Sequence, residues 1–373
     1  MPKVTVLMAV YNGECYLREA MDSILAQTFK DFEFLIINDG STDSTREIIC
    51  SYDDPRIRLI DNEQNLGLTK SLNKGWKLAE GEFIARQDAD DVSEPERLAK
   101  QVAFLETHPE VALLGSWFKN IDSQGGLIGE YDVPCDTIEI RWKILFHCPF
   151  IHGAVMFPKQ TITEQIGFYD EQFVYAQDYD LWWRITRKLK VANLDKYLMK
   201  LRTNSSSMTT NYGSIVDDEP LQIKLNHIRH LVGLEKAKKW SDGVLLEAMA
   251  SLWSSPPDEL KAIELQQLNI TIEEILKLHH NFCQYYQLSQ RESKKHYIQV
   301  CTHLSTQLLK LANYYFEQNK STTWQVLVQS YLLNKRILLT KGYLLLTLKL
   351  FLGSRFVNTI RYIRNQTTSQ YVK

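Results

Sequence analysis

The sequence predicts an α/β fold: a Rossmann-like, mostly parallel sheet flanked by helices and followed by a C-terminal helical extension. Three observations lead to this prediction. Short β-rich runs alternate with amphipathic helical patterns over the first hundred residues, polar and acidic residues follow directly on several of these runs, and apolar residues recur at helical spacing beyond residue 216. Alternating strands and helices form parallel sheets whose two faces are both covered.

Four β-rich runs are the strands of the predicted sheet: Val4–Val10, Phe32–Asn38, 57–60 and 83–85. The helices between these strands are identified by residues that share one helical face. One such face comprises Leu17, Met21, Ile24, Leu25 and Thr28, and a second comprises Leu68, Leu72, Trp76 and Ala79. A third helix is expected to begin with a capping box formed by Ser93 and Glu96.

Length and composition predict two domains, because 373 residues with 44% hydrophobic content exceed the usual range of a single core. We assign residues 1–215 to the α/β domain, which includes a further helix at 178–189, and residues 216–373 to the helical region. The boundary follows the polar segment 204–211, which is expected to be a loop. In the helical region, Thr271 and Glu274 are expected to form another capping box.

The formal net charge of -2 argues against a protein that binds nucleic acid over its whole surface. The charges are unevenly distributed, since residues 319–373 contain nine Lys or Arg and no Asp or Glu. Residues 335–364 place seven of these cations among leucine, isoleucine and phenylalanine side chains. This basic amphipathic pattern is typical of a segment that lies on an anionic membrane surface, and the alternative is a helix that packs on the acidic part of the same chain.

Six cysteines are scattered singly, without the spacing of a zinc site or a disulfide framework, which predicts a reducing setting. We expect no leader segment, because a strand begins as early as Val4. The longest apolar stretch, 343–352, is far shorter than the ~20 residues that span a bilayer. These features predict a cytoplasmic protein that can contact the inner face of the membrane peripherally.

The run Arg-Gln-Asp-Ala-Asp-Asp at 86–91 follows the fourth predicted strand, at the sheet edge where open α/β folds bind ligands. Asp88 and Asp90 alternate along the chain and can therefore face one ligand. Closely spaced carboxylates repel one another unless a cation lies among them, and their hard oxygens suit Mg2+ or Mn2+ shared with a diphosphate. The alternative is a solvated acidic turn that precedes a helix.

Two further groups follow strands at the same edge. Asp39 comes after the second strand and can accept a hydrogen bond from a uracil ring or a ribose hydroxyl, although its surroundings also fit a glycine turn and a helix start. Tyr11 comes after the first strand and can stack on a base whose edge meets the backbone of Ala9, although core packing of Tyr11 is the alternative. The convergence of three such groups at one edge favours a nucleotide site.

Seven motifs, in order between residue 4 and about residue 205, resemble the family 2 glycosyltransferases, which have the GT-A fold. They are Val-Leu-Met-Ala-Val-Tyr-Asn at 6–12, Asn-Asp-Gly-Ser-Thr-Asp at 38–43, Asn-Leu-Gly-Leu at 65–68, Gly-Glu-Phe-Ile-Ala-Arg-Gln-Asp-Ala-Asp-Asp at 81–91, Pro-Glu-Arg at 95–97, His-Gly-Ala-Val-Met at 152–156 and Gln-Asp-Tyr-Asp-Leu-Trp at 177–182. One such match would be weak evidence, whereas seven in order are specific.

The resemblance implies a role for each candidate residue. Ala9, Tyr11 and Asp39 would bind the base of the nucleotide, and Asp88 would contact its ribose and diphosphate. Asp90 would bind the metal, Mg2+ or Mn2+, and Asp178 would be the catalytic base.

Three positions bear on these roles. Gln177 stands where many relatives of the family have Glu, which removes a charge that would raise the pKa of the neighbouring carboxyl group. Asn204 stands where relatives often have a histidine, which weakens the expected hold on metal or diphosphate. His152 is expected either in the wall of the active site, as the resemblance implies, or as a hydrogen-bonded core residue.

The resemblance also implies an activity: metal-dependent, hexosyltransferase-type transfer of a sugar from a nucleoside-diphosphate sugar, with a UDP-sugar as the expected donor, to an acceptor hydroxyl. The acceptor would be a carbohydrate or lipid-linked molecule, the reaction would invert the anomeric centre, and the product would serve cell-surface polysaccharide or glycolipid synthesis. The alternatives are a nucleotidyltransferase that makes nucleotide sugars and a non-catalytic nucleotide- or sugar-binding scaffold. The first should carry a Gly-rich phosphate loop near residues 9–14, and the second should have lost Asp90 or Asp178.

Overall fold

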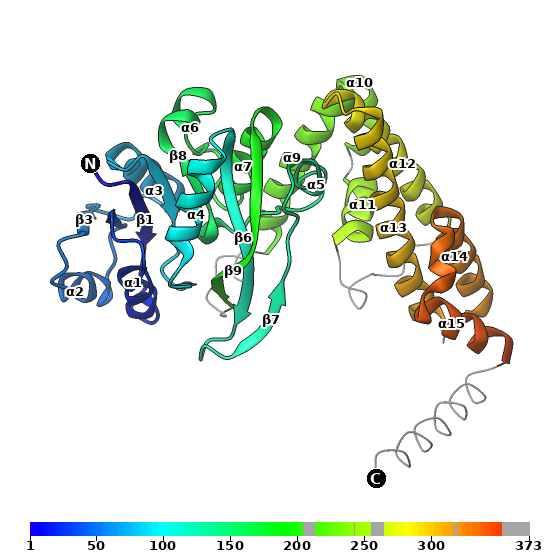
Figure 1. The fold of residues 1–373 in the computed structure, drawn as a ribbon, viewed down its shortest axis with the longest axis horizontal. Helices are drawn as coiled ribbons and strands as arrows, with labels where there is room; N and C mark the ends of the chain where they lie inside the picture. The colour runs from blue at the N-terminus through cyan, green and yellow to red at the C-terminus, as the bar shows by residue number, and fades with distance from the viewer. Residues whose placement is uncertain (204–212, 242, 255–264, 317–318, 353–373) are drawn as a thin grey trace, which may run out of the picture. The chain divides into compact units, whose positions relative to one another are not determined.

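A computed structural model of the chain describes residues 1–203, 213–241, 243–254, 265–316 and 319–352 (Figure 1). The chain forms two compact units, Met1–His227 and Ile228–Lys373. Within the described residues, the first unit contains strands and helices and the second contains helices alone. The predicted loop at 204–211 lies outside the described residues.

One sheet organises the first unit, and its nine strands lie in the order β3-β2-β1-β4-β8-β6-β9-β5, with β7 paired to β6, across the described part of the chain. The strands are β1 (Val4–Val10), β2 (Phe32–Asn38), β3 (Ile57–Asp61), β4 (Phe83–Arg86), β5 (Val92–Ser93), β6 (Val111–Ile121), β7 (Leu127–Tyr131), β8 (Met156–Pro158) and β9 (Lys190–Arg202). β1 is parallel to both of its neighbours, β2 and β4, and β2 is parallel to β3. The predicted parallel sheet is therefore confirmed, while β8 runs antiparallel to β4 and β6.

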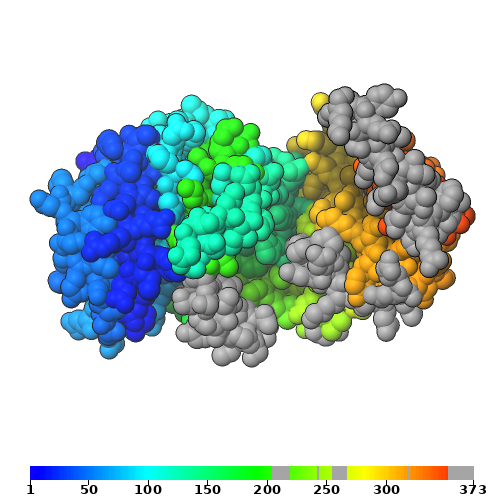
Figure 2. Space-filling view, turned by 90° about the horizontal axis from the view of Figure 1, so that it is seen from below, coloured from blue at the N-terminus to red at the C-terminus, as the bar shows by residue number. Residues whose placement is uncertain are grey.

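Helices cover both faces of this sheet (Figure 1). On one face lie α1 (Leu17–Leu25), α2 (Thr45–Cys50) and α4 (Arg97–Thr107), and on the other lie α3 (Leu68–Leu78), α5 (Thr137–Lys143), α6 (Lys159–Gln165) and α7 (Gln177–Lys188). Alternate residues of β1 enter the two cores, so Met8 packs in the core of α1 and Leu7 in the core of α3. Figure 2 shows blue residues of the amino-terminal part of the first unit beside cyan and green residues of its later part.

The second unit is a set of packed helices, as predicted for the C-terminal region. α9 (Gly213–Val232) begins in the first unit and ends in the second. The following elements are α10 (Leu234–Ala237), η2 (Lys238–Trp240), α11 (Val244–Ser254), α12 (Leu265–Tyr285), α13 (Gln290–Tyr315), α14 (Lys320–Leu333), η4 (Lys335–Leu339) and α15 (Lys341–Leu352). Among the described residues, no helix is long and apolar enough to cross a bilayer.

Both predicted capping boxes are wrong. Ser93 lies in β5, where its hydroxyl donates to Oε1 of Gln87 at 2.7 Å, and α4 begins without a side-chain cap. Thr271 lies inside α12, where its hydroxyl donates to the carbonyl of Gln267 at 2.8 Å. The motif is a local pattern, and in both places a different hydrogen-bond partner takes the hydroxyl group.

A buried arginine joins α4 to the end of β4. Arg97 is fully buried, and its Nη2 donates to the carbonyl of Arg86 at 2.6 Å. Its Nη1 donates to Oε1 of Gln87 and to Oγ of Ser93, each at 2.9 Å, and its Nε donates to Oε1 of Gln101 at 3.2 Å. Burial lowers the pKa of Arg97 to about 9, so the guanidinium group remains charged at neutral pH. This one side chain therefore donates to buried acceptors of β4, of the loop after β4, of β5 and of α4.

We expect Arg97→Met to lower the free energy of unfolding by about 3 kcal/mol, because it leaves several buried acceptors without a donor. Lys100→Met is the matched control on the same helix. Lys100 is exposed and its ion pair with Glu96, at 2.6 Å, lies at the surface, so this variant should change stability by no more than ~0.5 kcal/mol. Denaturant unfolding of the two variants checks the prediction, which equal losses would contradict.

Candidate active site

The predicted nucleotide-binding residues converge at one edge of the sheet. Tyr11 follows β1, Asp39 follows β2 and Asp88 follows β4, and these three parallel strands are adjacent. Tyr11 is 48% exposed, so the alternative that its ring packs in the core is wrong. Ala9 lies inside β1 in register with Ile37 of β2, with its side chain buried in the core. Only the backbone of Ala9 is therefore available to a ligand.

The loops after β1 and β2 are locked to each other by hydrogen bonds. Oδ1 of Asn12 accepts from the amide of Thr42 at 2.8 Å, and the amide of Asn12 donates to Oγ of Ser41 at 3.0 Å. The amide of Gly13 donates to Oγ1 of Thr45 at 2.8 Å. The Ser-Thr-Asp run at 41–43, which the sequence favours as a turn and helix start, thus also fixes the loop that carries Tyr11.

Asp39 has a structural task that the sequence alone does not reveal. Its side chain is 3% exposed, and Oδ1 accepts from Nδ2 of Asn62 at 2.7 Å and from the amide of Leu66 at 2.9 Å. Oδ2 accepts from the amide of Gly67 at 2.9 Å. A carboxylate oxygen has two lone pairs, so Oδ2 retains acceptor capacity for a ligand while the carboxylate orders the loop after β3.

Asp88 is held by the last residue of β4. Nη2 of Arg86, which is 1% exposed, lies 2.6 Å from Oδ1 of Asp88. Burial alone would raise the pKa of Asp88, but the charge of Arg86 outweighs this effect and lowers the pKa below its ordinary value. The Asp88 side chain is 27% exposed, so it presents an ionised group to whatever occupies the site.

The rest of the acidic loop is not a solvated turn. Asp91 is 1% exposed, its Oδ1 accepts from the amide of Arg202 at 2.9 Å, and its Oδ2 has no hydrogen-bond partner among the described residues. Burial raises the pKa of Asp91 well above its ordinary value, and the charges of Asp88 and Asp90 add to this effect. A Cβ atom on Gly153 would lie 2.9 Å from Oδ2 of Asp88 and 3.0 Å from Oδ2 of Asp91, so both oxygens face the bare Cα of that glycine.

These residues fit a divalent cation that is shared with a ligand. The loop offers hard oxygen donors of the kind that Mg2+ prefers. A cation would also reduce the repulsion among its crowded carboxylates and would provide a partner for the buried oxygen that lacks one among the described residues. Within the described residues, no group of three His, Cys, Asp or Glu side chains is arranged to hold a metal by itself. Mg2+ is commonly bound by one or two carboxylates together with substrate phosphates, and the loop fits that arrangement.

Arg202 fixes the acidic loop from the other side. It is 5% exposed, and its Nε donates to the carbonyl of Asp90 at 2.9 Å. Its Nη2 forms an ion pair with Oε2 of Glu19 at 2.5 Å, and its guanidinium group lies 4.6 Å from the ring centroid of Tyr16. Arg202 is thus a structural residue, whereas Asn204, two residues further along the chain, lies outside the described residues.

Asp178 is the second residue of α7 and has an unusual pKa. Burial raises that pKa to about 6, the charge of Asp88 adds to the rise, and the amide of Tyr179, 2.7 Å from Oδ1 of Asp178, opposes it. A nearby glutamate is therefore not needed for a raised pKa, although Gln177 replaces it here. Asp180, by contrast, is committed to an ion pair with Arg184 at 2.8 Å.

His152 is hydrogen-bonded, as one of its two sequence-based expectations requires, and it lies near Asp88. It lies in η1 (His152–Ala154), and its Nε2 is 2.9 Å from the hydroxyl of Tyr169. Burial, and then the charge of Arg86, lower the pKa of His152 to about 3, so the imidazole is neutral. Its ring lies edge-on to fully buried Trp182, with centroids 6.1 Å apart. His152 is therefore a hydrogen-bonded residue in the wall behind Asp88.

Glu219 is a residue of this site that the sequence analysis misses. It belongs to α9, beyond the predicted domain boundary, yet its carboxylate accepts from three consecutive amides just before α7. Oε1 accepts from Val174 at 2.9 Å, and Oε2 accepts from Tyr175 at 2.8 Å and from Ala176 at 2.9 Å. No local motif signals this role, because the two segments are distant in the chain.

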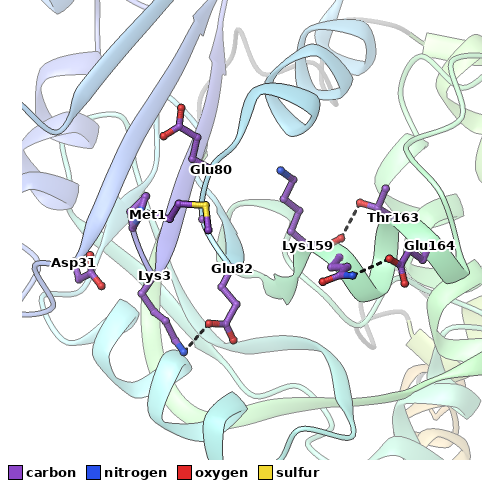
Figure 3. Close-up of a pocket in the computed structure, with 11 residues that line it drawn as sticks. Met1, Lys3, Asp31, Glu80, Glu82, Lys159, Thr163 and Glu164 are labelled. Carbon is purple, nitrogen blue, oxygen red and sulfur yellow. Dashed lines mark hydrogen bonds and ion pairs between the residues drawn. The ribbon is translucent and has the colours of Figure 1, made fainter.

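A separate cavity of about 600 Å³ lies at the opposite, amino-terminal ends of the parallel strands. Figure 3 shows Lys3, Glu80, Glu82 and Lys159 around it, and none of the predicted site residues lines it. Its charges already have partners: Lys3 pairs with Glu82 at 2.7 Å, and Nζ of Lys159 donates to the carbonyl of Ala79. The predicted site residues lie at the carboxyl edge of the parallel strands instead.

Known proteins resemble this chain in sequence and in fold. The family Glycosyl transferase family 2 matches residues 5–162. The chain is 36% identical over 211 residues to the putative glycosyltransferase EpsE of Bacillus subtilis, over 55% of this chain and 75% of that protein. It is 30% identical over 239 residues to an uncharacterized glycosyltransferase of Haemophilus influenzae, over 61% of this chain and 74% of that protein.

A solved structure shows the same fold at low identity. Staphylococcus aureus TarS 1-349, in complex with UDP-GlcNAc, matches with a TM-score of 0.53 and 20% identity over 90% of this chain and 91% of that chain. The likeness in fold, the order of the motifs and the sequence identity to two curated glycosyltransferases over most of their length all indicate the same family. This chain belongs to glycosyl transferase family 2.

Proposed function

We propose that this glycosyltransferase moves a hexosyl group from a nucleoside-diphosphate sugar, with UDP as the expected nucleotide, to an acceptor hydroxyl with inversion of the anomeric centre. The observation that carries the proposal is Asp178, a carboxyl group whose pKa of about 6 suits a base at neutral pH. Membership in the family argues against a nucleotidyltransferase, and the retention of Asp178 and Asp90 argues against a non-catalytic scaffold.

In the proposed reaction, Asp178 accepts the proton of the acceptor hydroxyl while the oxygen of that hydroxyl attacks the anomeric carbon. One bond forms between that oxygen and the carbon, and the bond from the carbon to the diphosphate oxygen breaks on the opposite side. A single displacement of this kind inverts the configuration. The base in this reaction must be ionised before proton transfer, and it is most effective when its pKa lies near the operating pH. The raised pKa of Asp178 meets both needs at neutral pH.

The donor would lie along the carboxyl edge of the parallel strands. The exposed ring of Tyr11 is free to stack on the base, the backbone of Ala9 can meet the edge of the base, and Oδ2 of Asp39 retains acceptor capacity for its imide. Asp88, ionised and partly exposed, is placed to contact the ribose and diphosphate. The complex of TarS with UDP-GlcNAc supports a UDP-sugar as the expected donor.

Asp90, with Asp88 beside it, would hold Mg2+ or Mn2+ together with the diphosphate. Such a cation, when bound, neutralises the charge that develops on the departing nucleoside diphosphate, which therefore needs no proton to leave. Asp91 remains buried beneath the site and supports it through the amide of Arg202.

The acceptor would be a carbohydrate or lipid-linked hydroxyl used in cell-surface polysaccharide or glycolipid synthesis. The enzyme would act in the cytoplasm, on the inner face of the membrane, with residues 335–364 in peripheral contact with anionic lipid. Residues 353–364 of this segment lie outside the described residues.

Asp178→Asn should lower turnover by at least ~100-fold while leaving donor binding largely intact, because it removes the base but keeps the shape of the side chain. Below pH about 6 the wild-type turnover should fall as Asp178 becomes protonated, and this acidic limb should be missing from the residual activity of the variant. Initial rates across the pH range, with donor affinity from calorimetry, check both expectations.

The same variant should be more stable than the wild type at pH 7.5. The folded pKa of Asp178 lies above its unfolded value of 3.8, so the ionised group destabilises the fold at neutral pH. This penalty begins to shrink as pH falls through about 6 and is gone below the unfolded pKa. Asp180→Asn is the matched control, since it breaks the pair with Arg184 and should cost stability with turnover retained. A larger loss of turnover in Asp180→Asn than in Asp178→Asn would show that the assignment of Asp178 as the base is wrong.

Asp90→Asn should reduce turnover by orders of magnitude with little loss of thermal stability, because it relieves crowded like charges while removing a metal ligand. Asp53→Asn, at an exposed position outside the site, should behave as wild type. Rates measured against Mn2+ and Mg2+ concentration test this, and full activity of the wild type in excess chelator would refute it.

Glu219→Gln should shift the acidic limb of the pH profile to lower pH. The substitution removes a negative charge from the amino-terminal end of α7, so the ionised form of Asp178 is favoured. Glu164→Gln, at an exposed position on α6, is the control and should leave the acidic limb of the pH profile in place. If Glu219 had a structural role alone, thermal stability would fall and the limb would not move.

A further inference from the structure

The outer side of α14 exposes an apolar stripe. Trp324, Val328 and Leu332 are spaced four residues apart, so they share one helical face, and they are 43%, 37% and 69% exposed. Large apolar side chains in such a row are seldom left in water without a function.

A second stripe on α15 continues the first. Leu344, Leu348 and Phe351 also share one face, and Phe351 is 72% exposed. The rings of Trp324 and Phe351 meet edge to face with centroids 5.5 Å apart, which joins the two stripes. We call these six residues the α14–α15 surface.

The helices that carry this surface are firmly packed on their inner sides. Val326 and Leu327 of α14 are fully buried, and Tyr343 and Leu346 of α15 are 7% and 1% exposed. The hydroxyl of Tyr343 donates to the carbonyl of Leu327 at 3.4 Å. The α14–α15 surface is therefore one side of a folded assembly, with a separate core beneath it.

Cations lie along the helices that carry this surface, and no acidic residue belongs to them. Lys320, Lys335, Arg336, Lys341 and Lys349 belong to α14, η4 and α15, and residues 319–373 contain no Asp or Glu. Among the described residues, none of these five cations forms an ion pair. Apolar side chains beside unpaired cations match the chemistry of an anionic lipid leaflet, which accepts both.

We propose that the α14–α15 surface binds the headgroup region of an anionic bilayer, with its apolar side chains inserted and its cations on the lipid phosphates. This proposal goes beyond sugar transfer, and it defines the lipid contact by residues of α14 as well as of the basic segment. A second copy of the chain fits less well, because an isologous contact through this surface would bring like charges together. Deletion from residue 335 onward is a poor test, since it removes Tyr343 and Leu346 from the core.

The experiment uses the full chain and vesicles of phosphatidylcholine with or without phosphatidylglycerol. The wild type should co-sediment with the anionic vesicles at low salt, release at high salt, and ignore phosphatidylcholine alone. Leu332→Glu with Leu348→Glu should weaken binding roughly tenfold or more, and Lys335→Glu with Arg336→Glu should do the same through charge. Ile298→Glu, at a 54% exposed position on α13 outside the surface, should bind as wild type.

Several results would overturn the proposal. They are absence of binding to anionic vesicles at low salt, equal binding by the surface variants and the wild type, and binding that appears only after residues 353–373 are deleted, which would make that segment the occupant. A concentration-dependent oligomer that Leu332→Glu abolishes would make a second copy the occupant instead. Transfer to a soluble acceptor should be unchanged in all surface variants, so failure of lipid binding is distinguishable from failure of the proposed catalysis.

Discussion

Buried positive charge beneath the carboxyl edge of the sheet is the constraint on which the site depends. Arg86, Arg97 and Arg202 are each at most 5% exposed, and buried cations persist only where acceptors surround them. The loop at 87–91 supplies many of these acceptors, through the side chains of Gln87 and Asp88 and the carbonyl of residue 90. The arginines in turn hold that loop in one conformation. The acidic groups are thus held in fixed positions, and the proposed function would depend on this, because electrostatic catalysis requires preorganised groups.

Two carboxyl groups in this site have pKa values shifted in opposite directions, and the difference lies in their contacts. Both are desolvated, but Arg86 bonds directly to Asp88 and acts on Asp178 only at a distance. Asp88 is therefore held ionised, as its proposed contact with a donor and a metal would require. Asp178 has a pKa near neutrality, as proton transfer requires. Neutral His152 lies behind Asp88 and adds no competing charge.

Several features of the fold and the site could be predicted because they are local patterns. The β-rich runs of β1 and β2, together with the residues that follow them, placed Tyr11 and Asp39 at one sheet edge without any knowledge of packing. The capping boxes failed for the complementary reason: Ser93 and Thr271 match the motif, but their hydroxyl groups bond elsewhere. Short motifs decide a helix start only where tertiary contacts leave the side chain available.

The sequence by itself determined the fold class, the family resemblance and the candidate residues. The succession of strands and helices, the ends of the strands and the spacing of the motifs can all be identified along the chain. The tertiary structure decided what each carboxyl group does. Asp39 orders the loop after β3, and Glu219 reaches the start of α7 from a distant helix. Asp91 is buried, and one of its oxygens has no hydrogen-bond partner in the described part of the chain. Burial, charge and hydrogen-bond partners set a pKa, and some of them come from residues that are far apart in sequence, as Asp88 is from Asp178.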